Sequence, residues 1–351
     1  MPTHNFKVPK GTLSSFETAD SPLLENLLGD PLKRTVAVYL PEGIDPEQDY
    51  PMLVDLAGFT GSGLSHLAWK GFGETLPQRI DRLIGEGSMA PAVFVFPDCF
   101  TSLGGNQYVD SLALGQWSSW LHQVLVPEIE ARYPVIPSPR ARGLFGKSSG
   151  GFGALHQALK HGEQWGAVVC HSGDMAFELC YQRDFPEVLL ALTQAGLSIP
   201  AYIERLHRRR RIGGSEMHVL MTLAMAASYD PDPSVPFGVR LPVDAETCVL
   251  DESRWSCWRS FDPLTQLEQV EAQARLKSLA GLFIDCGVRD QYHLLYGARR
   301  FSARCDALGI AHQFETFDDT HSGIDYRMDR SLPWLVSTLF EATASFASDR
   351  V

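Results

Sequence analysis

The clearest candidate for chemistry in this sequence is a serine in a glycine-rich turn. Residues 146–150 read Gly-Lys-Ser-Ser-Gly, and the small residues Gly151, Gly153 and Ala154 follow. The G-x-S-x-G pattern is weak alone, but here it falls between an expected strand and an expected helix. There the serine adopts a strained backbone, and neighbours without a Cβ avoid collisions. The pattern predicts that Ser148 is a nucleophile and that the Ser149 N–H, at the helix N-terminus, helps to hold an oxyanion.

The same residues have a rival interpretation, because Gly146-Lys-Ser resembles the end of a phosphate-binding loop. That motif requires a glycine five positions before Gly146, and position 141 is Ala. The apolar strand expected at 142–145 also runs up to Gly146 and leaves no room for the loop. The nucleotide-binding interpretation is therefore rejected.

Two loops near the C-terminus supply a candidate base and a candidate acid. His321 lies in Asp-Asp-Thr-His-Ser-Gly, after the last expected strand, and Asp290 lies beyond the next-to-last one. An order of nucleophile, acid and histidine along the chain is typical of this chemistry. His321 is therefore expected to move the proton and Asp290 to orient the histidine. Asp285, within the strand itself, is the alternative acid. The less favourably placed residues are His156 and His312 as bases, and Asp318, Asp319 and Asp325 as residues that shape the histidine loop.

The remaining site candidates would hold the oxyanion and the substrate. The loop Leu56–Gly63 is rich in glycine, and its Phe59 N–H, or that of Gly58, is the expected second oxyanion donor. The segment Phe96–Tyr108 is expected to add a pocket wall. The predicted substrate pocket consists of Gly58, Tyr108, Trp255 and Trp258, although buried packing would account for the tryptophans nearly as well.

Short apolar runs and longer helical stretches alternate along the chain, which is typical of a mostly parallel sheet with helices on both faces. The expected strands are Arg34–Leu40, Pro51–Leu56, Ala92–Phe96, Arg142–Phe145, Gly166–Cys170, Gly281–Cys286 and His312–Phe317. The expected helices are Thr75–Gly85, Ser111–Tyr133, Gly150–His161, Leu264–Leu279, Leu295–Leu308 and Ser331–Phe346.

One long interruption separates two of the expected strands. Residues 175–262 contain helical pieces, a basic run at Arg205–Arg211 and a proline-rich loop at Asp230–Pro236. So long a stretch is unlike a bare loop and is interpreted as an inserted helical cap. Residues 1–174 and 263–351 then form the core, and a true second domain is the alternative. The basic run is expected to be a solvated helix face.

Composition restricts the class of protein. With 44% hydrophobic and 21% charged residues the chain can build a large core. Its net charge of -12 argues against nucleic-acid and anionic-membrane surfaces. No signal peptide or spanning segment is recognisable, and the seven cysteines form neither a paired framework nor a zinc pattern. A cytoplasmic protein with reduced thiols and no metal or cofactor is expected; a homo-oligomer is left open.

Together these motifs resemble the Putative esterase family, which includes esterase D, S-formylglutathione hydrolase and enterochelin-esterase-like proteins. The resemblance runs from about Arg34 to Leu339. It implies an α/β-hydrolase fold and metal-free hydrolysis of small-molecule esters or thioesters by Ser148, Asp290 and His321, with backbone amides at Phe59 and Ser149. Two features depart from the family pattern. Ala57 replaces a frequent histidine, and the insertion exceeds the compact S-formylglutathione hydrolase pattern, so that substrate is not assumed.

The sequence thus predicts a serine esterase that works through an acyl-enzyme. Acyl transfer to an alcohol or sugar and hydrolysis of amides or peptides are alternatives with the same three residues. A binding protein that keeps the fold without catalysis is disfavoured by the complete Ser/Asp/His set.

Overall fold

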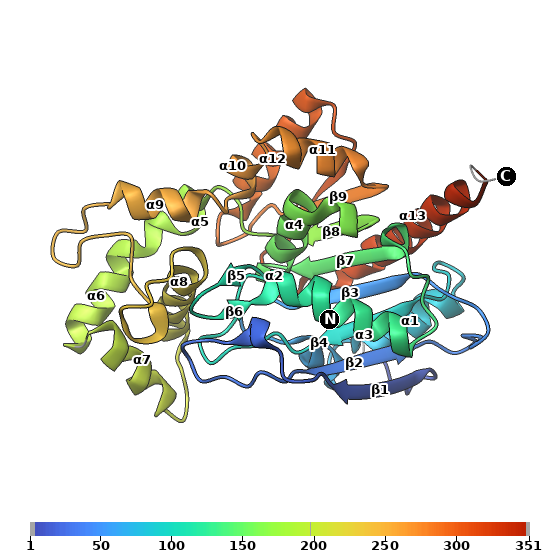
Figure 1. The fold of residues 1–351 in the computed structure, drawn as a ribbon, viewed down its shortest axis with the longest axis horizontal. Coiled ribbons are helices and arrows are strands. Elements are labelled where there is room, and N and C mark those ends of the chain that lie inside the picture. The colour runs from blue at the N-terminus through green and yellow to red at the C-terminus, as the bar shows by residue number, and fades with distance from the viewer. Residues whose placement is uncertain (1–3, 197, 349–351) are drawn as a thin grey trace.

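The computed structural model describes residues 4–196 and 198–348, and an eight-stranded sheet lies at its centre (Figure 1). The strand order is β1-β2-β4-β3-β7-β8-β9-β10. β2 pairs antiparallel with β1 and β4, and the pairs from β4 to β10 are parallel. Parallel strands end at the same edge, so the loops after β3, β7, β8, β9 and β10 meet there. The strands are β1 (Thr12–Glu17), β2 (Thr35–Leu40), β3 (Met52–Leu56), β4 (Val93–Pro97), β7 (Arg142–Lys147), β8 (Ala167–His171), β9 (Gly281–Gly287) and β10 (Gln313–Phe317).

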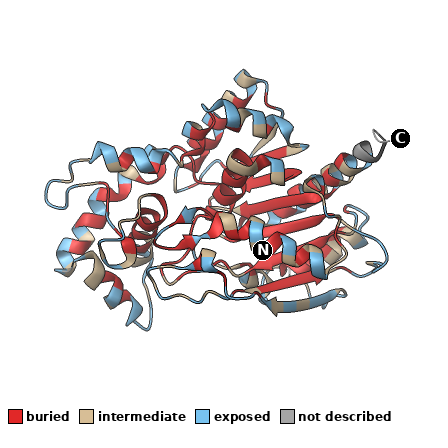
Figure 2. Ribbon diagram, viewed as in Figure 1, coloured by how far each residue is buried: buried red, intermediate tan, exposed pale blue. Residues whose placement is uncertain are grey.

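Both faces of the sheet are buried, as the red central strands in Figure 2 show. In β2, Val36 and Val38 join one hydrophobic cluster, whereas Ala37 and Tyr39 join the other. Successive side chains of a strand point to opposite faces, so a strand covered on both sides has an apolar run with few polar interruptions. This explains why the strands were recognisable as short apolar runs.

Helices cover the two faces in two groups. The larger hydrophobic cluster lies on the face covered by helix α4, and the smaller one lies beneath α1 and α13. On the first face the helical elements are α2 (Trp117–Trp120), the π-helical turn η3 (Leu121–Leu125), α3 (Val126–Arg132), α4 (Ser149–His161), α10 (Pro263–Gln266), α11 (Val270–Ser278) and α12 (Leu294–Leu308). On the second face they are α1 (Leu76–Gly85) and α13 (Met328–Ser348).

Between β8 and β9 the chain leaves the sheet and forms a helical lobe, at the left of Figure 1. It consists of α5 (Phe177–Cys180), η6 (Gln182–Asp184), α6 (Phe185–Ala195), α7 (Ile199–His207), α8 (Gly214–Tyr229), η7 (Pro236–Gly238) and α9 (Glu252–Arg259). This is the inserted helical cap expected from the sequence, and its proposed limits at 175 and 262 stay a prediction. In the basic run, Arg208 pairs with Glu204 and Arg209 with Glu216 at the exposed end of α7.

The structure departs from the expected elements in three places. β1 was missed, because only one face of this edge strand is even partly buried. The helix expected from Ser111 begins at Trp117 instead, because the short hairpin β5 (Asp110–Ser111) and β6 (Gly115–Gln116) precedes it. The helix expected at Leu264–Leu279 is divided into α10 and α11.

The remaining short helical turns are η1 (Pro22–Leu24), η2 (Gly63–Leu67), η4 (Pro139–Ala141), η5 (Gly162–Gln164) and η8 (Ile324–Arg327). Among the described helices, none is long and apolar enough to span a bilayer.

Candidate active site

Ser148 stands at a sharp turn between β7 and α4. Its backbone has φ 59° and ψ −127°. Residues other than glycine rarely adopt this conformation, and it stores strain. Its N–H donates to the carbonyl of His171 at 2.9 Å, and its carbonyl accepts from Phe152 N–H at 2.8 Å. These bonds tie the turn to β8 on one side and to the first turn of α4 on the other, and so hold the serine in the strained conformation.

Glycines around the serine let three backbones approach one another closely. A Cβ on Gly150 would overlap the carbonyl oxygen of Leu56, at the end of β3. A Cβ on Gly146 would lie 2.5 Å from the same oxygen and from the backbone of Gly150. Glycine is therefore required at both positions, and the turn holds Ser148 against the loop that follows β3.

His321 and Asp290 form a buried pair in the loops after β10 and β9. The His321 Nδ1 lies 2.8 Å from Asp290 Oδ2, and the carboxylate side chain is fully buried. Asp290 Oδ1 accepts the N–H of Tyr292 at 2.9 Å, and the Tyr292 ring packs edge-on against the imidazole. The Gln291 Oε1 accepts the N–H of His321 at 3.0 Å. These contacts fix both the ring plane and the nitrogen that faces the carboxylate.

Asp285, the alternative acid, has other partners. Its Oδ1 lies 2.7 Å from His171 Nδ1, and its Oδ2 accepts from Arg327 Nε at 2.8 Å. The second ring nitrogen of His171 is also occupied, at 2.8 Å from Ser331 Oγ. Asp285 thus belongs to a fully bonded network beneath α13.

The alternative bases lie outside the cavity that contains Ser148. His156 is buried in α4, stacked on Phe152, and burial lowers the pKa of its imidazole to about 3. His312 bonds through one ring nitrogen to Ser302 and through the other to the Ile310 carbonyl.

Ser148 and His321 line one cavity of about 570 Å³ at the carboxyl edge of the sheet, together with Gly58 and Phe59. A Cβ on Gly58 would lie 3.6 Å from the Ser148 Cβ, so the loop after β3 runs directly beside the serine. Ser149 is the first residue of α4, and the N–H groups of a first helical turn have no intrahelical acceptor. Among the described residues, no hydrogen-bond acceptor is found for Phe59 N–H. Phe59 lines the cavity and Ser149 follows Ser148 at the start of α4, so their N–H groups stay the predicted oxyanion donors.

Three predicted pocket residues lie behind the cavity wall instead, which corrects the sequence interpretation. The Tyr108 hydroxyl donates to the Ala57 carbonyl at 2.8 Å, and its ring occupies the space beside Gly153. Trp255 and Trp258 of α9 are 3% and 0% exposed and pack edge-on against Phe185. These large rings supply core packing, and Tyr108 supports the loop after β3.

The segment Phe96–Tyr108 has the same supporting role. Gly104, at φ 103°, and Gly105 lie against the Phe59 side chain, where any Cβ would meet the ring or its backbone. None of its residues is part of the cavity wall described above. The expected pocket wall is therefore a second layer that holds the loop after β3 in place.

Several polar side chains of the cavity were not predicted from the sequence. His66 and Lys147 lie on the side of β3 and β7, and Asp174 lies after β8. The Asp174 Oδ2 accepts from Tyr181 Oη at 2.7 Å and from Gln107 Nε2 at 2.9 Å, and burial raises the pKa of this carboxyl. The sequence contained one signal for His66. Asp55 lies inside the apolar run of β3, and a charge in a buried strand needs a partner, which here is His66.

The cap contributes the far side of the same cavity. Met217, His218 and Met221 of α8 reach it, as does Tyr292. The His218 Nε2 lies 3.0 Å from Asp184 Oδ2, and this carboxylate raises the pKa of the imidazole. Methionine and aromatic side chains give this wall an apolar, adaptable surface.

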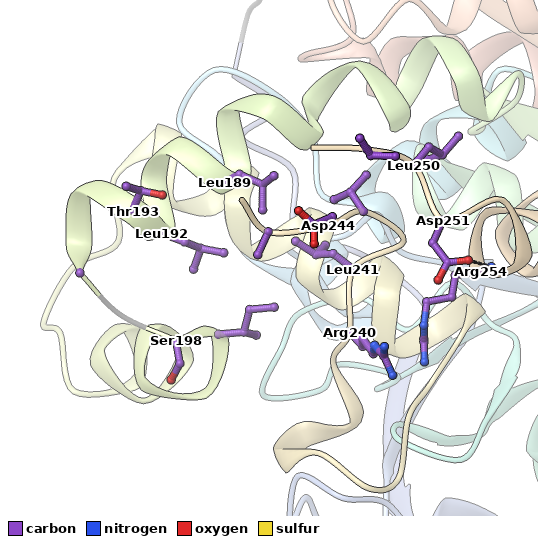
Figure 3. Close-up of a pocket in the computed structure, with 15 residues that line it drawn as sticks. Leu189, Leu192, Thr193, Ser198, Arg240, Leu241, Asp244, Leu250, Asp251 and Arg254 are labelled. Atoms are coloured by element: carbon purple, nitrogen blue, oxygen red, sulfur yellow. Dashed lines mark hydrogen bonds between the residues drawn. The ribbon is translucent and has the colours of Figure 1, made fainter. Parts of the chain in front are cut away.

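A separate cavity of about 740 Å³ lies within the cap, between α6, the start of α7 and residues 240–254 (Figure 3). Leucine side chains line much of it, and Arg254 at its edge pairs with Asp230 and Asp232. None of the predicted catalytic residues reaches it. Within residues 4–196 and 198–348, no group of three or more His, Cys, Asp or Glu side chains is arranged to hold a metal ion.

The chain is similar to known proteins in both sequence and structure. The family model described as "Putative esterase" matches residues 31–291, about three quarters of the chain. A ferulic acid esterase structure superposes with a TM-score of 0.59 at 18% identity, over 94% of this chain and 100% of the other. An S-formylglutathione hydrolase from Agrobacterium tumefaciens gives 0.57 at 16% identity, over 97% and 100%.

A third structure, the fluorophosphonate-binding serine hydrolase FphF of Staphylococcus aureus, gives a TM-score of 0.55 at 14% identity, over 93% and 98% of the two chains. No curated protein matches in sequence. The structural likenesses confirm the predicted α/β-hydrolase fold, and the family model identifies the kind of enzyme. The chain therefore belongs to the Putative esterase family and is a carboxylesterase-type hydrolase.

Proposed function

We propose that the chain hydrolyses small-molecule carboxylic esters through an acyl-enzyme on Ser148. The observation that carries this proposal is the meeting of three elements in one cavity: a strained serine at the start of α4, a histidine bonded to a buried carboxylate, and the loop after β3. Structural relatives named as esterases and as an S-formylglutathione hydrolase support the same class of reaction.

The proton movements follow from the hydrogen bonds of His321. With Nδ1–H donating to Asp290, the Nε2 carries the lone pair and takes the proton of the Ser148 hydroxyl as the oxygen attacks the acyl carbon. The N–H groups of Phe59 and Ser149 receive the oxyanion. His321 then protonates the leaving alcohol. A water molecule, deprotonated by the same nitrogen, attacks the acyl-enzyme and releases the acid.

Two other reactions would use the same groups. An acyltransferase would deliver the acyl group to an alcohol or sugar, which shows as ester product when water and acceptor compete in one assay. An amidase would cleave the isosteric amide at a rate comparable with that of the ester. Hydrolysis of esters with little transfer and little amide cleavage is the expected outcome.

Covalent labelling tests the proposal directly. An organophosphonate should label Ser148 alone, as located by peptide mass spectrometry. Ser148→Ala should abolish labelling and lower ester turnover on the order of a thousandfold or more without changing the unfolding midpoint. Ser278→Ala, on an exposed position of α11, is the control and should leave both unchanged. A label on another serine would disprove the assignment.

A further inference from the structure

The catalytic cavity contains an Asp–His pair that the proposed mechanism does not use. Asp55, near the end of β3, is fully buried, and its Oδ2 bonds to the Nδ1 of His66 in η2. The His66 side chain is 21% exposed and lines the cavity. In the strand order, β3 lies on one side of β7, and β9 and β10, which carry Asp290 and His321, lie on the other. The two pairs therefore approach Ser148 from opposite sides.

The free nitrogen of His66 distinguishes this pair from a purely structural one. In the buried pair of His171 and Asp285, both ring nitrogens are bonded. In His66 the Nδ1 faces Asp55, and among the described residues no partner is found for the Nε2. A ring whose outer nitrogen is unbonded and borders a cavity is available to a ligand.

Two lysines and two carboxylates lie around His66. The charge of Asp55 raises the pKa of His66, which favours the imidazolium. Asp325 bonds to Lys70 Nζ at 2.6 Å and lies 4.0 Å from Lys147 Nζ, beyond hydrogen-bonding distance. In this group the three basic residues, His66, Lys70 and Lys147, outnumber the carboxylates of Asp55 and Asp325. This local excess is unusual in a chain whose formal net charge is -12.

His66 and Lys147 both line the cavity that contains Ser148. Asp174 lines it too, but its Oδ2 is already bonded to Tyr181 and Gln107. The imidazolium Nε2–H and the lysine Nζ can donate charge-assisted hydrogen bonds, which are shorter and stronger with an anionic oxygen than with a neutral one. A carboxylate offers two such oxygens to two separate donors.

We propose that His66 and Lys147 form a subsite for a carboxylate group of the substrate, so that the preferred esters carry a free carboxylate besides the ester bond. This inference rests on the proposed ester hydrolysis at Ser148. His66 and Lys147 act as specificity-determining residues: they hold a part of the substrate that does not react. Asp55 raises the pKa of the imidazole and holds its Nδ1, so that the Nε2 stays free for a ligand.

The test compares matched charged and neutral esters. One series has the carboxylate in the acyl part: para-nitrophenyl half-esters of succinate, glutarate and adipate. Each is paired with a neutral ester in which two methyl groups replace the carboxylate oxygens. A second series has it in the alcohol part: the acetate of para-hydroxybenzoate, paired with that of para-isopropylphenol. The measured quantity is the ratio of kcat/KM for the charged ester to kcat/KM for its neutral partner.

In the series that reaches the subsite, Lys147→Met and His66→Gln should each lower this ratio about tenfold or more, the value of one charge-assisted hydrogen bond. Lys160→Met removes one positive charge from α4, outside the cavity, and should leave the ratio unchanged. A ratio that neither variant changes in either series would overturn the proposal. So would equal losses with charged and neutral esters, because His66 would then act on the reacting group.

A binding measurement separates this inference from the proposed chemistry. In Ser148→Ala, saturating glutarate should raise the Tm, and the added Lys147→Met should abolish most of that rise. An equal rise in both proteins would disprove the subsite even if esters are hydrolysed. Failure of the organophosphonate to label Ser148, with the glutarate effect intact, would instead refute the ester chemistry and leave an anion-binding site.

Discussion

Replacing either of two buried aspartates by asparagine should produce opposite effects, although both residues bond to a histidine. Asp290 Oδ1 accepts the Tyr292 N–H, so in Asp290→Asn the side-chain oxygen is expected to keep this bond and the NH₂ to face His321. An NH₂ group is a donor, and it would require an acceptor at Nδ1. The imidazole would then carry its proton on Nε2 and could no longer take one from Ser148.

The size of this effect follows from the tautomer alone. An analogous change in serine proteases lowers kcat by roughly 10⁴, which is about 5.5 kcal/mol of transition-state stabilisation. Asp290→Asn should therefore lower turnover of a para-nitrophenyl ester by three to four orders of magnitude, on that scale, while the protein stays folded. The N–H of Tyr292 and the Gln291 contact to His321 both remain satisfied.

Asp285→Asn is the matched comparison. This carboxylate bonds to His171 and Arg327 and is fully buried, so its loss leaves the guanidinium of Arg327 without one of its two carboxylate partners. Removing one partner of a buried ion pair costs about 3–5 kcal/mol. Urea unfolding and initial rates on both variants would separate the two roles. Loss of turnover in Asp285→Asn together with loss of stability in Asp290→Asn would refute the assignment of the acid.

Three further predictions concern packing and protonation. Trp258→Ala should cost about 3–5 kcal/mol in unfolding free energy and leave the acyl chain-length preference unchanged, because the ring is core; a changed preference would return it to the pocket. Gly150→Ala should lower the unfolding midpoint strongly, since its Cβ would overlap the Leu56 carbonyl, whereas Gly85→Ala, with no atom within 4 Å of its Cβ, should not. As the pH is lowered, His156 takes up a proton from about pH 6.5 in the unfolded state but only near pH 3 in the folded state. The unfolding free energy should therefore decrease as the pH is lowered from 6.5 to 3. His156→Phe should make that fall shallower, as measured by urea midpoints at pH 7 and pH 4.5, and an unchanged slope would contradict the buried neutral imidazole.

The sequence predicted the central strands well because burial on both faces leaves a distinctive apolar run. It failed for β1, whose residues Thr12–Glu17 are mostly exposed and have no such run. The predicted helix before β7 was too long, because the spacing of apolar residues continues across the hairpin at Asp110–Gln116. Periodicity reports which side chains are buried, and it says little about where the backbone turns back on itself.

For the candidate site, motif order identified the residues that the loops bring together, namely Ser148, Asp290 and His321. The pocket residues were chosen by side-chain type, and that criterion failed for Trp255 and Trp258. An aromatic ring on a helix can face either a cavity or the core, and the choice depends on partners such as Phe185 from another part of the chain. The pair of Asp55 and His66 was missed for a similar reason, because its two residues meet only when η2 folds back over β3.

The burial of its longest helix limits how far the cap can move. Its longest helix, α8, is buried from Val219 to Tyr229 apart from Met221, and the Tyr229 ring lies against Phe152 on the helix that begins at Ser148. Moving such a cap away would expose apolar surface of the interior and loosen the packing of the helix that begins beside Ser148. We therefore expect esters to enter and acids to leave between the loops that border the cavity, while the cap stays in place. Replacing this cap by the cap of a relative would therefore also require new side chains in the interior that packs against it.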